Sequence, residues 1–127
     1  MKHLTLLSAL ALALCAFAAR ALDVMPYQAG SFAQARAAGK VTALQFHSGW
    51  CPVCVMQSRS LEGLKNDPQL ANVIVFQADF AKEDELRRRF GVHAFSTLVI
   101  FRGEEERARA TGDFQPERLK ALFARAL

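Results

Sequence analysis

Cysteine is scarce in this chain, with three among 127 residues. Cys15 lies in an apolar N-terminal segment, so the rest of the chain has a single pair, Cys51 and Cys54, separated by two residues. A disulfide stabilises a fold mostly by closing a long loop, and a two-residue spacer closes almost none. The scarcity of cysteine therefore disfavours a disulfide-stabilised scaffold, and the close spacing of the remaining pair favours chemistry.

The chain also lacks a concentrated excess of positive charge. Its 16 lysines and arginines stand against 12 acidic residues, and its most basic run, Arg87–Arg89, follows the acidic run Glu83–Glu85 at a spacing of four residues. Acid before base at that spacing is typical of a solvated helix, which it stabilises by about 0.2–0.5 kcal/mol per pair. A nucleic-acid partner needs basic residues gathered on one face, and we predict none.

A long uncharged run made mostly of leucine and alanine occurs only at the N-terminus. Residues 4–19 carry no charge, follow the basic start of residues 1–3, and precede the small-residue site Ala19-Arg20-Ala21. This order is typical of a secretory signal. A helix of this length reaches about 24 Å, short of a hydrocarbon core of about 30 Å, which disfavours a retained membrane anchor. We therefore predict a cleaved signal peptide at residues 1–21 and one domain at residues 22–127.

Cleavage changes the composition of what remains. Ala16-Phe17-Ala18 is an alternative cut site close to the first. Removal of residues 1–21 takes away Lys2, Arg20 and Cys15, so 14 basic residues face 12 acids and the net charge falls from +4 to about +2. We predict a monomer in the periplasm or the secreted space, an oxidising compartment, with no stable membrane insertion after cleavage.

Segments typical of strands alternate with segments typical of helices along this domain. Residues 23–30 are expected to be a lead-in segment, and Ser31 is expected to cap the first helix. The expected strands are residues 41–46, 73–78, 97–101 and an edge strand at 107–111, and the expected helices are residues 31–38, 52–65, 81–90 and 115–127. This alternation predicts an α/β fold with a central mixed β-sheet and helices on both faces.

Cys51 and Cys54 lie where a strand ends and a helix begins, and Pro52 suits the first turn of that helix. Unpaired N–H groups and partial positive charge at a helix start lower the pKa of a thiol there, and the thiolate is the form that attacks disulfides. We expect Cys51 to attack a partner disulfide and form a mixed disulfide. Cys54 then attacks Cys51 and releases the reduced partner, and the reverse sequence oxidises the partner.

Two other interpretations of the pair remain open, a structural disulfide and half of a metal site. Structural zinc takes four ligands, and His47 and His93 are the side chains that could complete two thiolates. His47 lies four residues before Cys51 and could also tune its thiolate. The alternative, which we favour, places His47 at a partly exposed strand end and His93 in a loop, with no part in the chemistry.

Residues 46–54, Phe-His-Ser-Gly-Trp-Cys-Pro-Val-Cys, resemble the active-site segment of the thioredoxin superfamily. Residues 90–101 resemble its second signature, and Gly112 falls where the family usually has a glycine. The match covers about residues 28–127, and the chain is similar to exported members such as the C-terminal thioredoxin-like domain of DsbD. The resemblance implies a thioredoxin fold, dithiol–disulfide exchange with protein substrates, a redox donor protein, and no bound cofactor or metal.

Five residues around the pair are candidates for contact with the substrate. Trp50 lies directly before Cys51 and has the largest side chain of the five. The candidates are Trp50, Pro52, Val53, Phe95 and Ser96.

The chain departs from the family at two positions. The family normally has a cis-proline after the residue that matches Phe95, facing the disulfide, and this chain has Ser96. A cis bond before another residue costs about 3 kcal/mol, so a trans bond is possible here. Thioredoxin itself has a buried aspartate six residues before the first cysteine, which assists proton transfer. Gln45 occupies that position and cannot act as an acid or a base.

Serine restores a backbone N–H that proline lacks and adds a hydroxyl. The strand pattern from Thr97 onward is retained, so we expect the segment before it to pass close to both sulfurs. We expect Ser96→Pro to be tolerated by the fold, to reduce any metal retained by the cysteines and to change the lifetime of mixed disulfides.

The sequence thus predicts an exported thiol–disulfide oxidoreductase that uses Cys51 and Cys54, with reduction as the favoured direction. The alternative is a protein of the same fold that binds a metal or cluster through these two cysteines. A purely structural exported module is a further alternative, and it would show no disulfide exchange.

Overall fold

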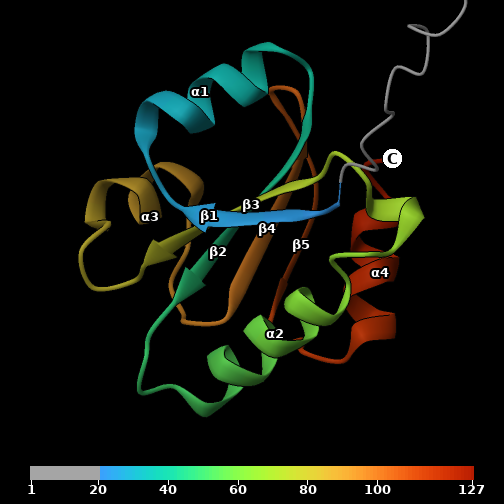
Figure 1. Cartoon of the computed structure of the whole chain (residues 1–127). Coiled ribbons are helices and arrows are strands. Elements are labelled where there is room, and N and C mark those ends of the chain that lie inside the picture. Colours follow the sequence, from blue (N-terminus) through green and yellow to red (C-terminus); the bar gives the residue numbers. More distant parts are fainter. Residues whose placement is uncertain (1–20) are drawn as a thin grey trace, which may run out of the picture.

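The computed structural model describes residues 21–127, so the predicted signal peptide lies outside the described residues apart from Ala21. Within this described part, five strands form one sheet in the order β1-β3-β2-β4-β5 (Figure 1). Strands β1, β3 and β2 run parallel, and β4 and β5 continue the sheet antiparallel. The strands are β1 (Asp23–Pro26), β2 (Val41–His47), β3 (Ile74–Asp79), β4 (Thr97–Arg102) and β5 (Glu105–Thr111).

In residues 21–127, four α-helices cover the two faces of this sheet, and α2 and α4 lie together on one side in Figure 1. The helices are α1 (Ala29–Ala37), α2 (Pro52–Gly63), α3 (Asp84–Phe90) and α4 (Pro116–Ala124), with a short 3-10 helix at Pro68–Leu70. The predicted α/β architecture, a central mixed sheet with helices on both faces, is confirmed. Within residues 21–127, no helix is both long enough and apolar enough to cross a membrane.

Two hydrophobic cores lie on opposite faces of the sheet because successive side chains of a strand point in opposite directions. In β2, Leu44 and Phe46 pack in the core beneath α1 and α3, whereas Ala43 packs in the core beneath α2 and α4. Gln45 points to the same face as Ala43, toward α2, and is completely buried. The uncharged polar side chain of Gln45 therefore lies in the middle of the central strand, below the middle of α2.

The N-terminal part of the domain differs from the sequence prediction. Residues 23–26, expected to be a lead-in, form the edge strand β1, which pairs parallel with β3. Four half-exposed residues ending at a proline carry too little pattern to reveal a strand whose pairing is entirely long-range. Helix α1 begins at Ala29 after Gln28, without a side-chain cap, so the predicted cap at Ser31 is wrong.

Helix α3 begins three residues later than predicted. The carboxylate of Asp79 accepts hydrogen bonds from the backbone N–H groups of Ala81 and Lys82, at 2.9 and 3.2 Å, and so holds a turn before the helix. Gly91 ends α3 as expected, in the left-handed conformation with φ of 63°. The predicted edge strand at 107–111 is confirmed and extends back to Glu105.

Candidate active site

Cys51 lies directly before α2 and acts as its N-cap. Its backbone N–H donates to the carbonyl of Ser48 at 3.2 Å, and its Sγ accepts the backbone N–H of Cys54 at 3.3 Å. Pro52 is the first helical residue, where its missing N–H costs no hydrogen bond. Both cysteines are free thiols, and Cys51 is 8% exposed whereas Cys54 is completely buried. The predicted placement of Cys51 at a helix start is therefore confirmed.

The surroundings shift the pKa values of the two thiols in opposite directions. Hydrogen bonds from the side chains of Cys54 and then Ser96 lower the pKa of Cys51, against the raising effect of burial. Burial, followed by the hydrogen bond to Cys51, raises the pKa of Cys54. Cys51 is therefore the sulfur that ionises first, and Cys54 keeps its proton while Cys51 is a thiolate. This order is what an attacking and a resolving thiol require.

Ser96 lies against both sulfurs, which confirms that the segment before Thr97 passes close to them. Its Oγ is 3.5 Å from Sγ of Cys51 and 3.2 Å from Sγ of Cys54. No peptide bond in residues 21–127 is cis, and Ser96 itself has a positive φ of 59°. Its backbone N–H donates to the carbonyl of Phe46 at 2.9 Å. The serine therefore supplies a buried hydroxyl and a backbone donor where the family has a proline.

Beneath the cysteines, buried amides form a connected hydrogen-bond network. Gln57 donates through Nε2 to the carbonyl of Ser96 at 3.1 Å and to that of Asp113 at 2.8 Å. Gln45 donates through Nε2 to Oε1 of Gln57 at 3.2 Å and to Oγ of Ser58 at 3.0 Å. Gln77 of β3 donates to Oε1 of Gln45 at 3.1 Å. The network connects the central strand to the backbone of Ser96.

Gln45 could be recognised from the sequence, whereas its partners Gln57 and Gln77 were not predicted. Gln57 is three residues after Cys54, so a helix places it on the same face as the buried cysteine. An amide on the buried face of a helix was the signal that would have revealed it. Gln77 has no such signal, because its link to Gln45 depends on the pairing of β3 with β2.

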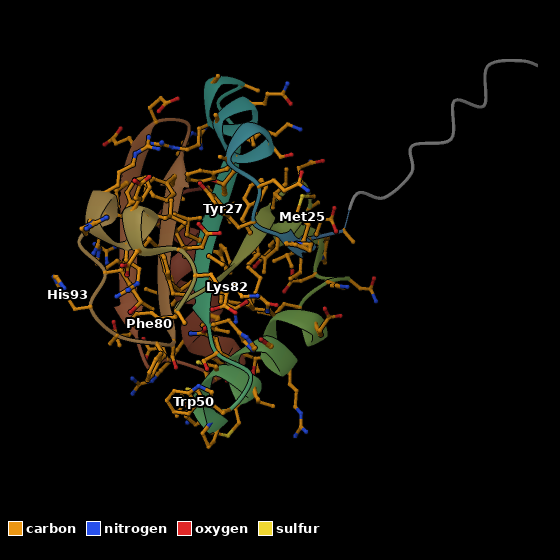
Figure 2. The ribbon with its side chains drawn as sticks, turned by 90° about the vertical axis from the view of Figure 1, so that its left-hand side faces the viewer. Met25, Tyr27, Trp50, Phe80, Lys82 and His93 are labelled. Atoms are coloured by element: carbon orange, nitrogen blue, oxygen red, sulfur yellow. The ribbon has the colours of Figure 1, made fainter. Side chains whose placement is uncertain are left out.

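The other predicted contact residues surround the pair on the surface. Trp50 is 73% exposed, and its ring packs edge-on against Phe95 at a centroid distance of 4.8 Å. Phe95 in turn packs against Phe80 at 4.6 Å. Figure 2 shows Trp50 at the tip of the molecule beside the start of α2, on the same side as Phe80. Pro52 is exposed and Val53 half-buried, so the five candidates surround the cysteines.

The two histidines considered as metal ligands lie in different elements. His47 is the half-buried last residue of β2, and His93 is exposed in the loop after α3, pointing away from the domain in Figure 2. In the described part of the chain, no three side chains of histidine, cysteine, aspartate or glutamate are grouped so that they could hold a metal ion. Nothing in the geometry of this site favours the metal-binding alternative.

Comparison with known proteins identifies the family. A family model described as Thioredoxin matches residues 23–125. The chain belongs to the thioredoxin family. The predicted superfamily and thioredoxin fold are thereby confirmed, and Cys51 and Cys54 are positioned as the active-site pair of such a protein.

Three relatives illustrate the similarity of this thioredoxin-family chain. The crystal structure of Trxlp from Edwardsiella tarda EIB202 superposes with a TM-score of 0.74 at 33% identity, covering 78% of this chain and 97% of that one. Mitochondrial thioredoxin-2 of Schizosaccharomyces pombe is 36% identical over 75 residues, 59% of this chain and 55% of the relative. Thioredoxin 2 of Plasmodium falciparum is 26% identical over 87 residues, 68% of this chain and 55% of the relative. The chain thus spans about half the length of these two curated relatives.

Proposed function

We propose that this protein is a thiol–disulfide oxidoreductase that exchanges a disulfide between Cys51 and Cys54 with protein partners. The observation that carries the proposal is the asymmetry of the pair. Cys51 caps a helix, is the more exposed sulfur and has a lowered pKa, whereas Cys54 is completely buried with a raised pKa. The Cys51 thiol is suited to attack the disulfide of a partner, and the Cys54 thiol is suited to resolve the mixed disulfide that forms.

The surface around Cys51 fits a polypeptide substrate better than a small molecule. Trp50 and Met56 are large apolar side chains that remain exposed, at 73% and 38%, and Phe95 extends the aromatic surface next to Trp50. Exposed aromatic side chains are enriched where proteins bind proteins. We therefore assign Trp50, Pro52, Val53, Phe95 and Ser96 to substrate contact, with a second redox protein as the source of electrons.

We further propose that the protein acts as a reductant in the periplasm or the secreted space. Export is supported by the signal-like residues 1–21, and direction by the resemblance to reducing exported domains. A cut after Ala21 would leave Leu22 as the first residue, and Leu22 is 1% exposed in the core beneath α2 and α4. The family match begins one residue later, at Asp23, so this cut would spare the whole domain.

Trapping of mixed disulfides tests the roles of the cysteines. Cys54→Ser should accumulate a covalent complex with a disulfide-bonded protein substrate, because the attack by Cys51 proceeds and the release step is missing. Cys51→Ser is the matched control and should accumulate none. Non-reducing gels followed by mass spectrometry identify the linked residue. A complex formed by Cys51→Ser and not by Cys54→Ser would reverse the assignment, and no exchange by the unaltered protein would reject the function.

Equilibration with glutathione buffers of known ratio tests the direction. A reduction potential of the Cys51–Cys54 couple near that of thioredoxin, about −270 mV, supports a reductant. A potential near that of DsbA, about −120 mV, overturns the direction and leaves the exchange activity in place.

Mass spectrometry of the intact protein recovered from a bacterial host tests export. A mass that corresponds to a chain starting at or near Leu22 supports cleavage. A mass of all 127 residues would reject it.

A further inference from the structure

We propose that the hydroxyl of Ser96 is a catalytic group of the disulfide exchange, passing its hydrogen bond from the sulfur of Cys51 to the sulfur of Cys54 between the two steps. The inference deepens the proposed function and rests on it. Three independent features of the structure carry it: the position of the hydroxyl, the strained backbone beneath it, and the lack of charge in the amides that adjoin it.

The hydroxyl is the side-chain group that both sulfurs share. Its oxygen lies 3.2 Å from Sγ of Cys54 and 3.5 Å from Sγ of Cys51, and Ser96 is 3% exposed. A hydroxyl has one proton to donate and two lone pairs that accept. It can therefore donate to the thiolate of Cys51 while the S–H of Cys54 is directed at the same thiolate. Rotation about one C–O bond is enough to direct its proton to Cys54 instead.

The backbone of Ser96 is held in a conformation that serine rarely adopts. Its φ of 59° lies in the left-handed region, which is unfavourable for residues with a Cβ. Three hydrogen bonds maintain it: the N–H donates to Phe46, and the carbonyl accepts from Nε2 of Gln57 and from the N–H of Gly112 at 3.1 Å. Strain that is over-determined by its surroundings is characteristic of functional positions. Here it fixes the hydroxyl between the sulfurs.

The groups that hold Ser96 carry no charge. Gln45, fully buried below the site, and Gln57 are amides that neither bind nor release a proton in the physiological range. Asp113 contributes its carbonyl to Gln57, and its carboxylate pairs with Arg118 at 3.2 Å. A hydroxyl next to both sulfurs can stabilise a thiolate without a buried acid. It supports thiolate formation through a hydrogen bond, whereas the aspartate of thioredoxin itself assists that step by proton transfer.

The reaction balances without a further reactant. The Cys51 thiolate, holding the Ser96 proton in a hydrogen bond, attacks one substrate sulfur, and the other substrate sulfur leaves as a thiolate. Cys51 is then uncharged in the mixed disulfide, so the hydroxyl turns to Cys54 and stabilises its thiolate once the S–H proton has passed to water. Cys54 attacks Cys51, the bond to the substrate breaks, and the second substrate thiolate leaves. Two electrons pass from the cysteines to the substrate, whose thiolates take protons from water.

Two substitutions separate the hydroxyl from the backbone. Ser96→Ala and Ser96→Gly both remove the hydroxyl, but alanine keeps the strain of the positive φ and glycine relieves it. Ser60→Ala is the control, since Ser60 of α2 is half-buried and donates its hydroxyl to a backbone carbonyl, that of Phe114. Glycine fits a φ of 59°, so a folded variant without the hydroxyl is available even if alanine fails to fold.

The first readout is the alkylation of Cys51 by iodoacetamide as a function of pH in the reduced protein. The second is the rate at which a preformed mixed disulfide between Cys51 and glutathione is resolved by Cys54. We expect both variants to move the alkylation midpoint to higher pH and to slow resolution about tenfold, since a hydrogen bond to a charged group is worth at least that factor. We expect Ser60→Ala to change neither.

Opposite effects of alanine and glycine would assign the role to the backbone and overturn the proposal. Unchanged midpoints and rates in both variants would also overturn it. Because alkylation does not require a protein substrate, this failure is distinguishable from failure of the proposed function. If the unaltered protein exchanges no disulfides and the midpoint still moves in both variants, the hydroxyl contact stands and the oxidoreductase function falls.

Discussion

Ser96→Pro would restore the proline that the thioredoxin family has at this position, and the structure predicts that it destabilises the fold. Proline requires a φ near −65°, whereas Ser96 has a φ of 59°. Proline also has no N–H, and the N–H of Ser96 donates to the carbonyl of Phe46, a fully buried residue of β2. The expectation from sequence alone, that the fold tolerates this change, therefore disagrees with the observed geometry.

The expected loss of stability follows from the lost N–H donor and from the change in φ. Leaving the buried carbonyl of Phe46 without a partner costs about 1–3 kcal/mol. Turning the backbone to a negative φ also disturbs the bonds that the Ser96 carbonyl accepts from Gln57 and Gly112, each worth about 1 kcal/mol. Relief of the left-handed conformation returns about 1–2 kcal/mol. A net loss of about 2 kcal/mol lowers the midpoint of thermal unfolding by about 8–16 °C in a domain of this size.

The assay is thermal and urea unfolding of the reduced protein, followed by circular dichroism, with Ser96→Gly as the control. Glycine keeps the N–H and fits the positive φ, so its unfolding midpoint should stay within a few degrees of that of the unaltered protein. A proline variant as stable as the glycine variant would refute the reasoning. It would mean that the segment before β4 changes its path at little cost, and that Ser96 is not held as tightly as its hydrogen bonds imply.

Three further predictions concern other buried or paired groups. Gln45→Glu places a carboxyl in a fully buried site, and burial raises the pKa of that carboxyl above the ordinary value of about 4.3. The native state then binds the proton more tightly than the unfolded chain does. Urea unfolding should therefore show that the stability of the variant falls from about pH 4 to pH 7 by more than that of the unaltered protein. Arg36 is 7% exposed, and its guanidinium lies over three phenylalanine rings. Arg36→Ala should lower the stability in thermal unfolding by about 3 kcal/mol, and Arg36→Met by less, because a methionine can still contact the rings. Equal losses of stability in the two variants would contradict this. The hydrogen-bonded ion pair with Lys120 is the main cause of the lowered pKa of Asp67, so Lys120→Met should raise that pKa in an NMR titration. In the unaltered protein, the contribution of the pair to stability disappears as the pH falls through the pKa of Asp67. An unchanged pKa of Asp67 in the variant would contradict the pairing.

Much of the fold was predictable because its signals are local. Strands β2, β3 and β4 are rich in apolar residues on both faces, as expected for strands covered on both sides, and Gly91 ends α3 as a glycine ends many helices. Strand β1 was not predictable for the opposite reason. Residues 23–26 are short and half-exposed, and what makes them a strand is the parallel edge of β3, which lies about fifty residues away in the sequence.

The residues of the site were likewise predictable only where the signal is local in the sequence. Cys51 and Cys54 were identified because their spacing and their place between a strand and a helix are visible in one stretch of sequence. Ser96 and Gln45 were identified only as departures from the family, with no indication that they interact. Gln57 supplies that link, since its side chain binds Gln45 at one end and the carbonyl of Ser96 at the other. A connection through a third residue cannot be predicted from two unusual positions.

The two departures can be explained together by one requirement. A dithiol pair needs a group that stabilises negative charge on each sulfur in turn. A buried acid can serve by moving a proton, whereas the fully buried Gln45 cannot. Proline at position 96 would offer neither an N–H nor a hydroxyl, and a site with glutamine and proline would have no such donor there. Serine supplies the hydroxyl, and the glutamine network that replaces the acid also fixes the serine backbone through Gln57. The loss of the acid and the gain of the hydroxyl are therefore two parts of one arrangement.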